Sequence, residues 1–152
     1  MTTRVYEAKA ALFARVAALA AAGQPLDGVQ VAYAAPRSQD LQRECVYGGG
    51  TRFTHNDAVA ERGVLVDEVA LVSLYIRVAS AAAGAVAATD ARVAAIFATL
   101  AAALTATPLL PGDLRIAAIT QGQGDYDQTV DETLSILGVQ VRIESTLTYG
   151  GG

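Results

Sequence analysis

The sequence predicts one small α+β domain with a mixed or antiparallel sheet of about four to five strands and two helices packed on one face. The segment Asp67–Ala79 is the longest apolar stretch with the two-residue period of a strand. Two other segments carry apolar residues every three or four positions, the spacing of an amphipathic helix. The length of 152 residues is that of a single domain able to fold without disulfides or metals.

The first helix is predicted from about Arg4 to Ala22, with Thr3 as its N-terminal cap and Gly23 at its end. A half-buried strand is predicted at 29–34, where apolar and small or polar residues alternate. The apolar stripe of the helix consists of Val5, Ala8, Leu12, Val16 and Leu19.

A second strand is predicted at 44–47, and the segment from about 48 to 66 has no sustained period of either kind. Long irregular segments in compact domains are typically functional or disordered. We therefore interpret 48–66 either as a binding arm or as an extended hairpin that becomes ordered in an assembly. Substitutions of its charged and polar residues are expected to spare folding and to disturb assembly. These candidate interface residues are Arg52, His55, Asp57, Glu61 and Arg62.

The central strand Asp67–Ala79 has two different faces. One is uniformly apolar and is expected to lie under the two helices. The other is mixed, and its apolar members need cover from a neighbouring subunit or from the chain's own arm. The apolar face carries Ala70, Val72, Leu74, Ile76 and Val78, and the mixed face carries Val69, Leu71, Ser73, Tyr75 and Arg77.

A small-residue linker at 79–88 leads to the second helix, which we expect Thr89 or Asp90 to cap. The spacing predicts a strand at 114–121, a loop at 122–127 and a final strand at 133–149. Gly138 is expected to mark a bulge or twist in that last strand. The stripe of the second helix consists of Val93, Ile96, Phe97, Leu100 and Leu104.

No motif for catalysis, a metal or a cofactor stands out. His55 is the only histidine and Cys45 the only cysteine, too few ligands for a transition-metal site, and Cys45 is interpreted as a packing residue. The glycines at 48–50 lack the lysine and helix of a phosphate loop and indicate a flexible hinge. We predict no enzyme, no cofactor and no metal. The acidic residues Asp125, Asp127, Asp131 and Glu132 miss the ligand spacing of a calcium loop and indicate a solvated turn.

Charge and hydropathy argue against two classes of partner, nucleic acid and membranes. The net charge of -4 and the pI of about 4.8 argue against binding nucleic acid through its phosphates. No segment approaches the roughly 18 uninterrupted apolar residues of a membrane span, so no membrane is predicted. Charges interrupt the apolar residues near the N-terminus, so no export signal is expected.

The order of these elements resembles the tail terminator, or tail completion, proteins of long-tailed bacteriophages. The resemblance runs through the segments GVQVAYAAP, ECVYGGGTRF, DEVALVSLYIRVAS, DARVAAIFATLAAAL, LRIAAITQG and LSILGVQVRIEST. It implies a structural protein of the virion neck, made in the bacterial host cytoplasm, that forms a homohexameric ring. Such a ring would end the tail tube and join it to the head–tail connector, with tail tube protein and connector protein as partners. DNA would pass through without specific binding.

Two alternatives remain open from the sequence. The first keeps the structural class but places the protein elsewhere in the neck or among minor tail components, such as the head–tail connector. The second is a cellular α+β domain that binds a small molecule, or an unusual hydrolase that uses His55 and Asp57.

Overall fold

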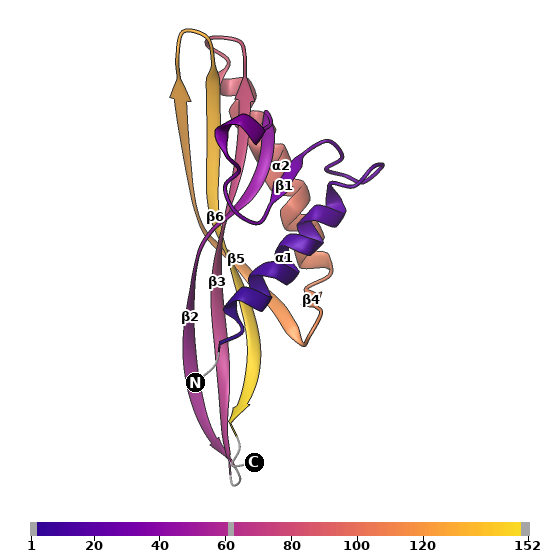
Figure 1. Cartoon of the computed structure of the whole chain (residues 1–152), viewed down its shortest axis with the longest axis vertical. Helices are drawn as coiled ribbons and strands as arrows, with labels where there is room; N and C mark the ends of the chain where they lie inside the picture. The colour runs from indigo at the N-terminus through magenta and orange to yellow at the C-terminus, as the bar shows by residue number, and fades with distance from the viewer. Residues whose placement is uncertain (1–2, 61–62, 150–152) are drawn as a thin grey trace.

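The computed structural model describes residues 3–60 and 63–149, and the side chains at 57–60, 63–66, 121 and 147–149 lie outside this description. Two helices cover one face of a long, twisted sheet (Figure 1). The sheet has six strands in the order β1-β2-β3-β6-β5-β4, more than the four to five predicted. The α+β class and the two helices on one face agree with the prediction.

The sheet consists of four long strands, β2, β3, β5 and β6, and two short edge strands, β1 and β4. β1 runs parallel to β2, and the remaining neighbours pair antiparallel. The strands are β1 (Gln30–Ala32), β2 (Glu44–Ala60), β3 (Gly63–Ser80), β4 (Leu109–Leu110), β5 (Leu114–Gln128) and β6 (Thr133–Tyr149). The helices are α1 (Val5–Leu19), α2 (Val86–Ala106) and the short 3-10 helix η1 (Ser38–Asp40).

The core lies between the helices and one face of the sheet. The predicted apolar face of β3 is buried there, and β6 adds Val139, Val141 and Ile143 from the adjacent strand. Each fully buried aliphatic side chain contributes about 1.5 to 3 kcal/mol. The helices contribute the stripes predicted from their spacing, with Phe97 at the margin: Val5, Ala8, Leu12 and Val16 from α1, and Val93, Ile96, Leu100 and Leu104 from α2.

The segment predicted to be irregular is part of a regular hairpin. β2 continues to Ala60 and pairs with β3, and β6 pairs with the other side of β3 along the same length. The sequence showed no period there because the strands extend beyond the helices, so neither helix covers them (Figure 1). Backbone pairing with two neighbours stabilises β3 in this three-stranded projection.

The glycines at 48–50 do not form a flexible hinge. They lie in β2 at a register shift between Gly48 and Thr51. A Cβ on Gly48 would lie 2.2 Å from the Tyr33 carbonyl oxygen, and one on Gly49 would lie 2.4 Å from the Tyr75 ring. Close packing therefore explains Gly48 and Gly49, whereas a Cβ on Gly50 would meet nothing within 4 Å.

Two predictions for the C-terminal strands are wrong. The expected loop at 122–127 belongs to β5, whose register shifts twice against β6. β6 pairs with β3 without a shift at Gly138, so that glycine marks no bulge against β3. A Cβ there would lie 2.9 Å from Tyr75, and the glycine makes room for this ring.

The second helix begins at Val86, three residues before the expected cap. Thr89 is buried in the first turn, where its hydroxyl donates to the Val86 carbonyl oxygen and lies 2.7 Å from the Ser135 hydroxyl. Thr89 therefore connects the helix to β6. Helix α2 has the length and apolar composition of a membrane span, a property shared by core helices of globular proteins, and its apolar stripe packs on the sheet.

Replacing Leu74 by Asp is expected to prevent folding. Leu74 is 0% exposed at the centre of β3, and an unpaired buried charge costs several kcal/mol of a total stability of about 5 to 15. Ile143→Asp, at 1% exposure, should behave alike. The matched control is Val130→Asp, because Val130 is 88% exposed. Circular dichroism of the purified variants measures the effect, and folded Leu74→Asp protein would contradict this core.

Candidate assembly surface

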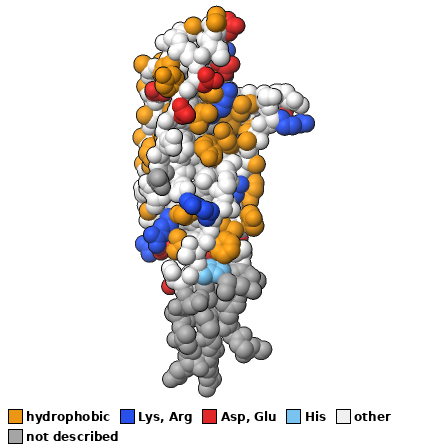
Figure 2. All heavy atoms as spheres, turned by 90° about the vertical axis from the view of Figure 1, so that its left-hand side faces the viewer, with side chains coloured by type: hydrophobic (Ala, Val, Ile, Leu, Met, Phe, Trp, Pro, Cys, Tyr) orange, Lys and Arg blue, Asp and Glu red, His pale blue; other side chains and the backbone are white. Residues whose placement is uncertain are grey.

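The face of the sheet that lies opposite the helices has no second layer within the described residues. Figure 2 views this open face, where hydrophobic side chains mix with polar and charged ones. The mixed residues of β3 point to it, and each is only partly buried by its neighbours in the sheet. The open face therefore still exposes part of its apolar side chains.

A pair of tyrosines forms the middle of the open face. Tyr47 of β2 and Tyr75 of β3 are register partners, and their rings stack with centroids 5.3 Å apart and planes at 23°. Gly49 and Gly138 lie on either side of Tyr75, where added side chains would collide with its ring. The glycines thus let the aromatic ring lie flat across three strands.

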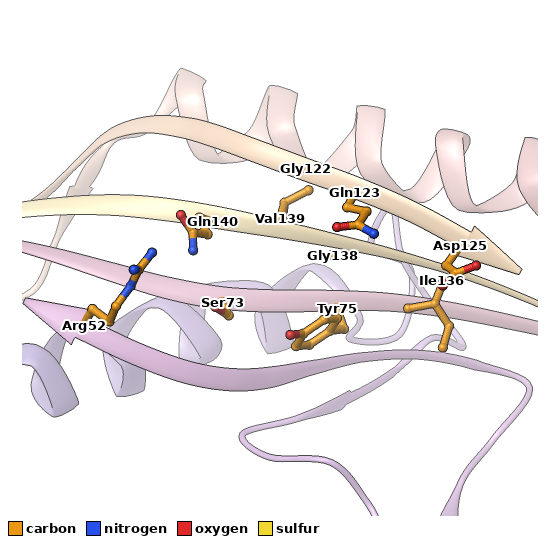
Figure 3. Close-up of a pocket in the computed structure, with 10 residues that line it drawn as sticks. All are labelled: Arg52, Ser73, Tyr75, Gly122, Gln123, Asp125, Ile136, Gly138, Val139 and Gln140. Carbon is orange, nitrogen blue, oxygen red and sulfur yellow. The ribbon is translucent and has the colours of Figure 1, made fainter.

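A shallow groove of about 580 Å³ runs across this face beside Tyr75 (Figure 3). Arg52 lies at one end and Asp125 at the other, and Ser73 and Gln140 lie between them. The apolar part of the groove lining comes from the Tyr75 ring, Ile136 and Val139. Its remaining lining residues are Gly122, Gln123 and Gly138.

Charges of opposite sign occupy different parts of the open face. Arg52, Arg115 and Arg142 lie on the part nearer the projection, where only Arg142 has an ion-pair partner among the described side chains, Glu144 at 3.0 Å. The other end, at the β5–β6 turn, carries the acidic residues (Figure 2). There Arg77 lies 3.6 Å from Glu132. The acidic residues of this end are Asp125, Asp127, Asp131 and Glu132.

Burial makes the two titratable groups beside Tyr75 poor nucleophiles at neutral pH. Burial raises the pKa of Tyr47, and the neighbouring Tyr75 and Cys45 add to the increase. Burial also raises the pKa of the Cys45 thiol, against the opposing effect of Arg77. Both groups therefore stay protonated, and Cys45, at 0% exposure, packs in the sheet as predicted.

The candidate interface residues of the sequence do not form one cluster. Arg52 is exposed on the open face, where it meets the groove. His55 has the opposite parity and lies on the helix side, with 9% of its side chain exposed. The backbone of Asp57 pairs with Val66 but its side chain is not described, and Glu61 and Arg62 lie outside the described residues.

His55 connects the hairpin to the start of α1. Its Nε2 lies 2.6 Å from a carboxylate oxygen of Glu68, its register partner on β3. The second oxygen of Glu68, which is 1% exposed, accepts the backbone N–H of Arg4 at 2.8 Å, and the Thr3 hydroxyl accepts that of Val5. Glu68 thus satisfies a donor at the helix terminus, so substitution of His55 is no longer expected to spare folding.

Among the described residues, no group of three or more His, Cys, Asp or Glu is arranged to hold a metal ion. The sequence reasoning missed the contributions of Tyr47 and Gln123 to the open face. Alternation in β2 could have identified Tyr47, whereas Gln123 lay in the segment assigned to a loop.

Comparisons with known proteins show a likeness in fold to solved structures. No protein-family model matches the chain, and no curated protein matches its sequence. Among solved structures, the chain is similar to one from the virion of a native gene transfer agent (GTA) particle. The identity is 22%, the match covers 95% of this chain and 100% of that chain, and the TM-score is 0.53. The two chains therefore share their fold along nearly their whole length.

Replacing His55 by Ala should destabilise the fold. The change leaves an oxygen of the buried Glu68 carboxylate without its imidazole partner, which costs about 1 to 3 kcal/mol. The adjacent Thr54→Ala is the matched control, because Thr54 is exposed on the open face. Chemical denaturation measures both. Equal free energies of unfolding for His55→Ala and Thr54→Ala would contradict this role.

Proposed function

We propose that this chain is a virion structural protein of a long-tailed phage or phage-like particle, and that it forms the ring that terminates the tail tube. The likeness in fold to a chain of a GTA virion supports the general class. The resemblance in element order to tail terminator proteins supports the specific role. The observation that carries the proposal is the open sheet face with its half-buried apolar and aromatic residues.

In a ring, neighbouring copies can cover the open sheet face and pair with the two sheet edges. Contact between different surfaces of successive copies closes into a ring when the rotation between them is a simple fraction of a turn. The open face then borders the lumen or a partner, and the helices with their apolar core lie on the other side (Figure 1). We propose a hexamer, as in the tail terminator family.

The charge of the chain suits a channel for DNA. The net charge is -4, and the acidic residues of the β5–β6 turn lie on the open face or next to it. With this acidic end at the lumen, the ring repels phosphates and lets DNA pass without being held. The proposed partners are the tail tube protein at one end of the ring and the head–tail connector protein at the other, with the virion neck as location.

Negative-stain electron microscopy of the purified protein tests this function. We expect rings of about six copies and co-sedimentation of the protein with tail tubes. Rings that bind connector protein but ignore tubes would place the chain at the connector instead. A protein that stays monomeric at high concentration and ignores tail tubes would contradict the proposal.

A further inference from the structure

The two edges of the sheet have long open stretches. β1 pairs only with 45–47 of β2, and β4 pairs only with 114–115 of β5. Within the described residues, no strand adds to β2 after Tyr47 or to β5 after Arg115. Register shifts end by Thr51 in β2 and by Gly122 in β5, so regular strand follows in both. Open regular edges present unpaired backbone groups to another chain.

The open edges carry opposite charges on the same face. Arg52 lies on the β2 edge, whereas Asp125 and Asp127 lie on the β5 edge. Register pairing places all three on the open face, and Arg52 and Asp125 line the two ends of the groove (Figure 3). None of the three has an ion-pair partner among the described side chains. The β2 edge therefore carries a positive charge and the β5 edge carries negative charges that could pair with it.

We infer that the β2 edge of one copy pairs with the β5 edge of the next copy, and that Arg52 meets Asp125 and Asp127 across this joint. The inference rests on the proposed ring and names its contact surface. The partner is a second copy of this chain, because the complementary charge lies on the opposite edge of the same molecule. Such a contact joins different surfaces and continues from copy to copy.

The spacing of the charges matches the geometry of a closed sheet. Arg52 is level with Arg142 of β6, and Asp125 is level with Ile136, six positions before Arg142 on that strand. Joining the edges through these charges thus displaces successive copies by six residues. Strands in closed barrels tilt by about 35 to 45°, which gives roughly one residue of stagger per strand. Four strands per copy then require roughly four to six residues.

Charge reversal at one edge should weaken assembly. Arg52→Glu places like charges in the joint, and so does the double change Asp125→Arg with Asp127→Arg. Each is expected to raise the dissociation constant of the ring about tenfold, as for close charge pairs at interfaces. The matched control is Arg37→Glu, since Arg37 is exposed in the loop before η1 and pairs only with Asp40 among the described side chains. Circular dichroism verifies that all variants fold.

An equimolar mixture of the two reversed variants makes the test decisive. When the variants alternate, one joint holds both reversed edges and the next holds both natural edges, so every joint regains opposite charges. We expect the mixture to form rings at the same concentration as the wild-type protein. Native mass spectrometry should detect both variants in each ring. A single chain that carries all three changes should also assemble.

If either reversed variant alone formed rings with the copy number and dissociation constant of the wild-type rings, the inference would be overturned. The proposed function would remain intact. Failure of the mixture to assemble would also overturn it. A wild-type protein without rings would contradict the proposed function itself. Wild-type assembly is therefore measured first under the same conditions.

Discussion

The fold depends on the antiparallel pairing of β3 with β2 on one side and β6 on the other. The pairing with β6 runs from Val64 to Ser80 of β3 without a shift, and the pairing with β2 shifts once, between Gly48 and Thr51. One face of the three strands is consequently apolar and receives both helices. The same alternation gives the opposite face its mixed character, so a single constraint creates the core and the assembly surface.

The helices and the central strand could be predicted because burial imposes a period on the sequence. Leu12, Val16, Ile96 and Leu100 repeat at helical spacing since they contact the sheet, and β3 alternates since one of its faces is covered. The final strand was predicted with the bounds that the structure has. These elements all adjoin the core, where the burial of one face appears as a regular apolar period in the local sequence.

The wrong predictions concern strands in which buried and exposed residues do not alternate regularly. β2 beyond Tyr47 and β5 beyond Gln121 extend past or beside the helices, and glycines interrupt their alternation. Their strand structure depends on pairing with distant residues, which the local pattern does not contain. His55 illustrates the consequence for the site: its partner Glu68 belongs to the next strand, and only the register brings them together.

We propose that further copies of the chain cover the open sheet and its free edges. Hydrogen–deuterium exchange at low and high protein concentration tests it most directly, because pairing of an edge protects its backbone N–H groups. We expect slower exchange at 122–128 of β5 and 51–56 of β2 at the concentrations that give rings, with exchange in the α2 core unchanged. Exchange at both edges that does not depend on concentration, in protein that forms rings, would contradict it.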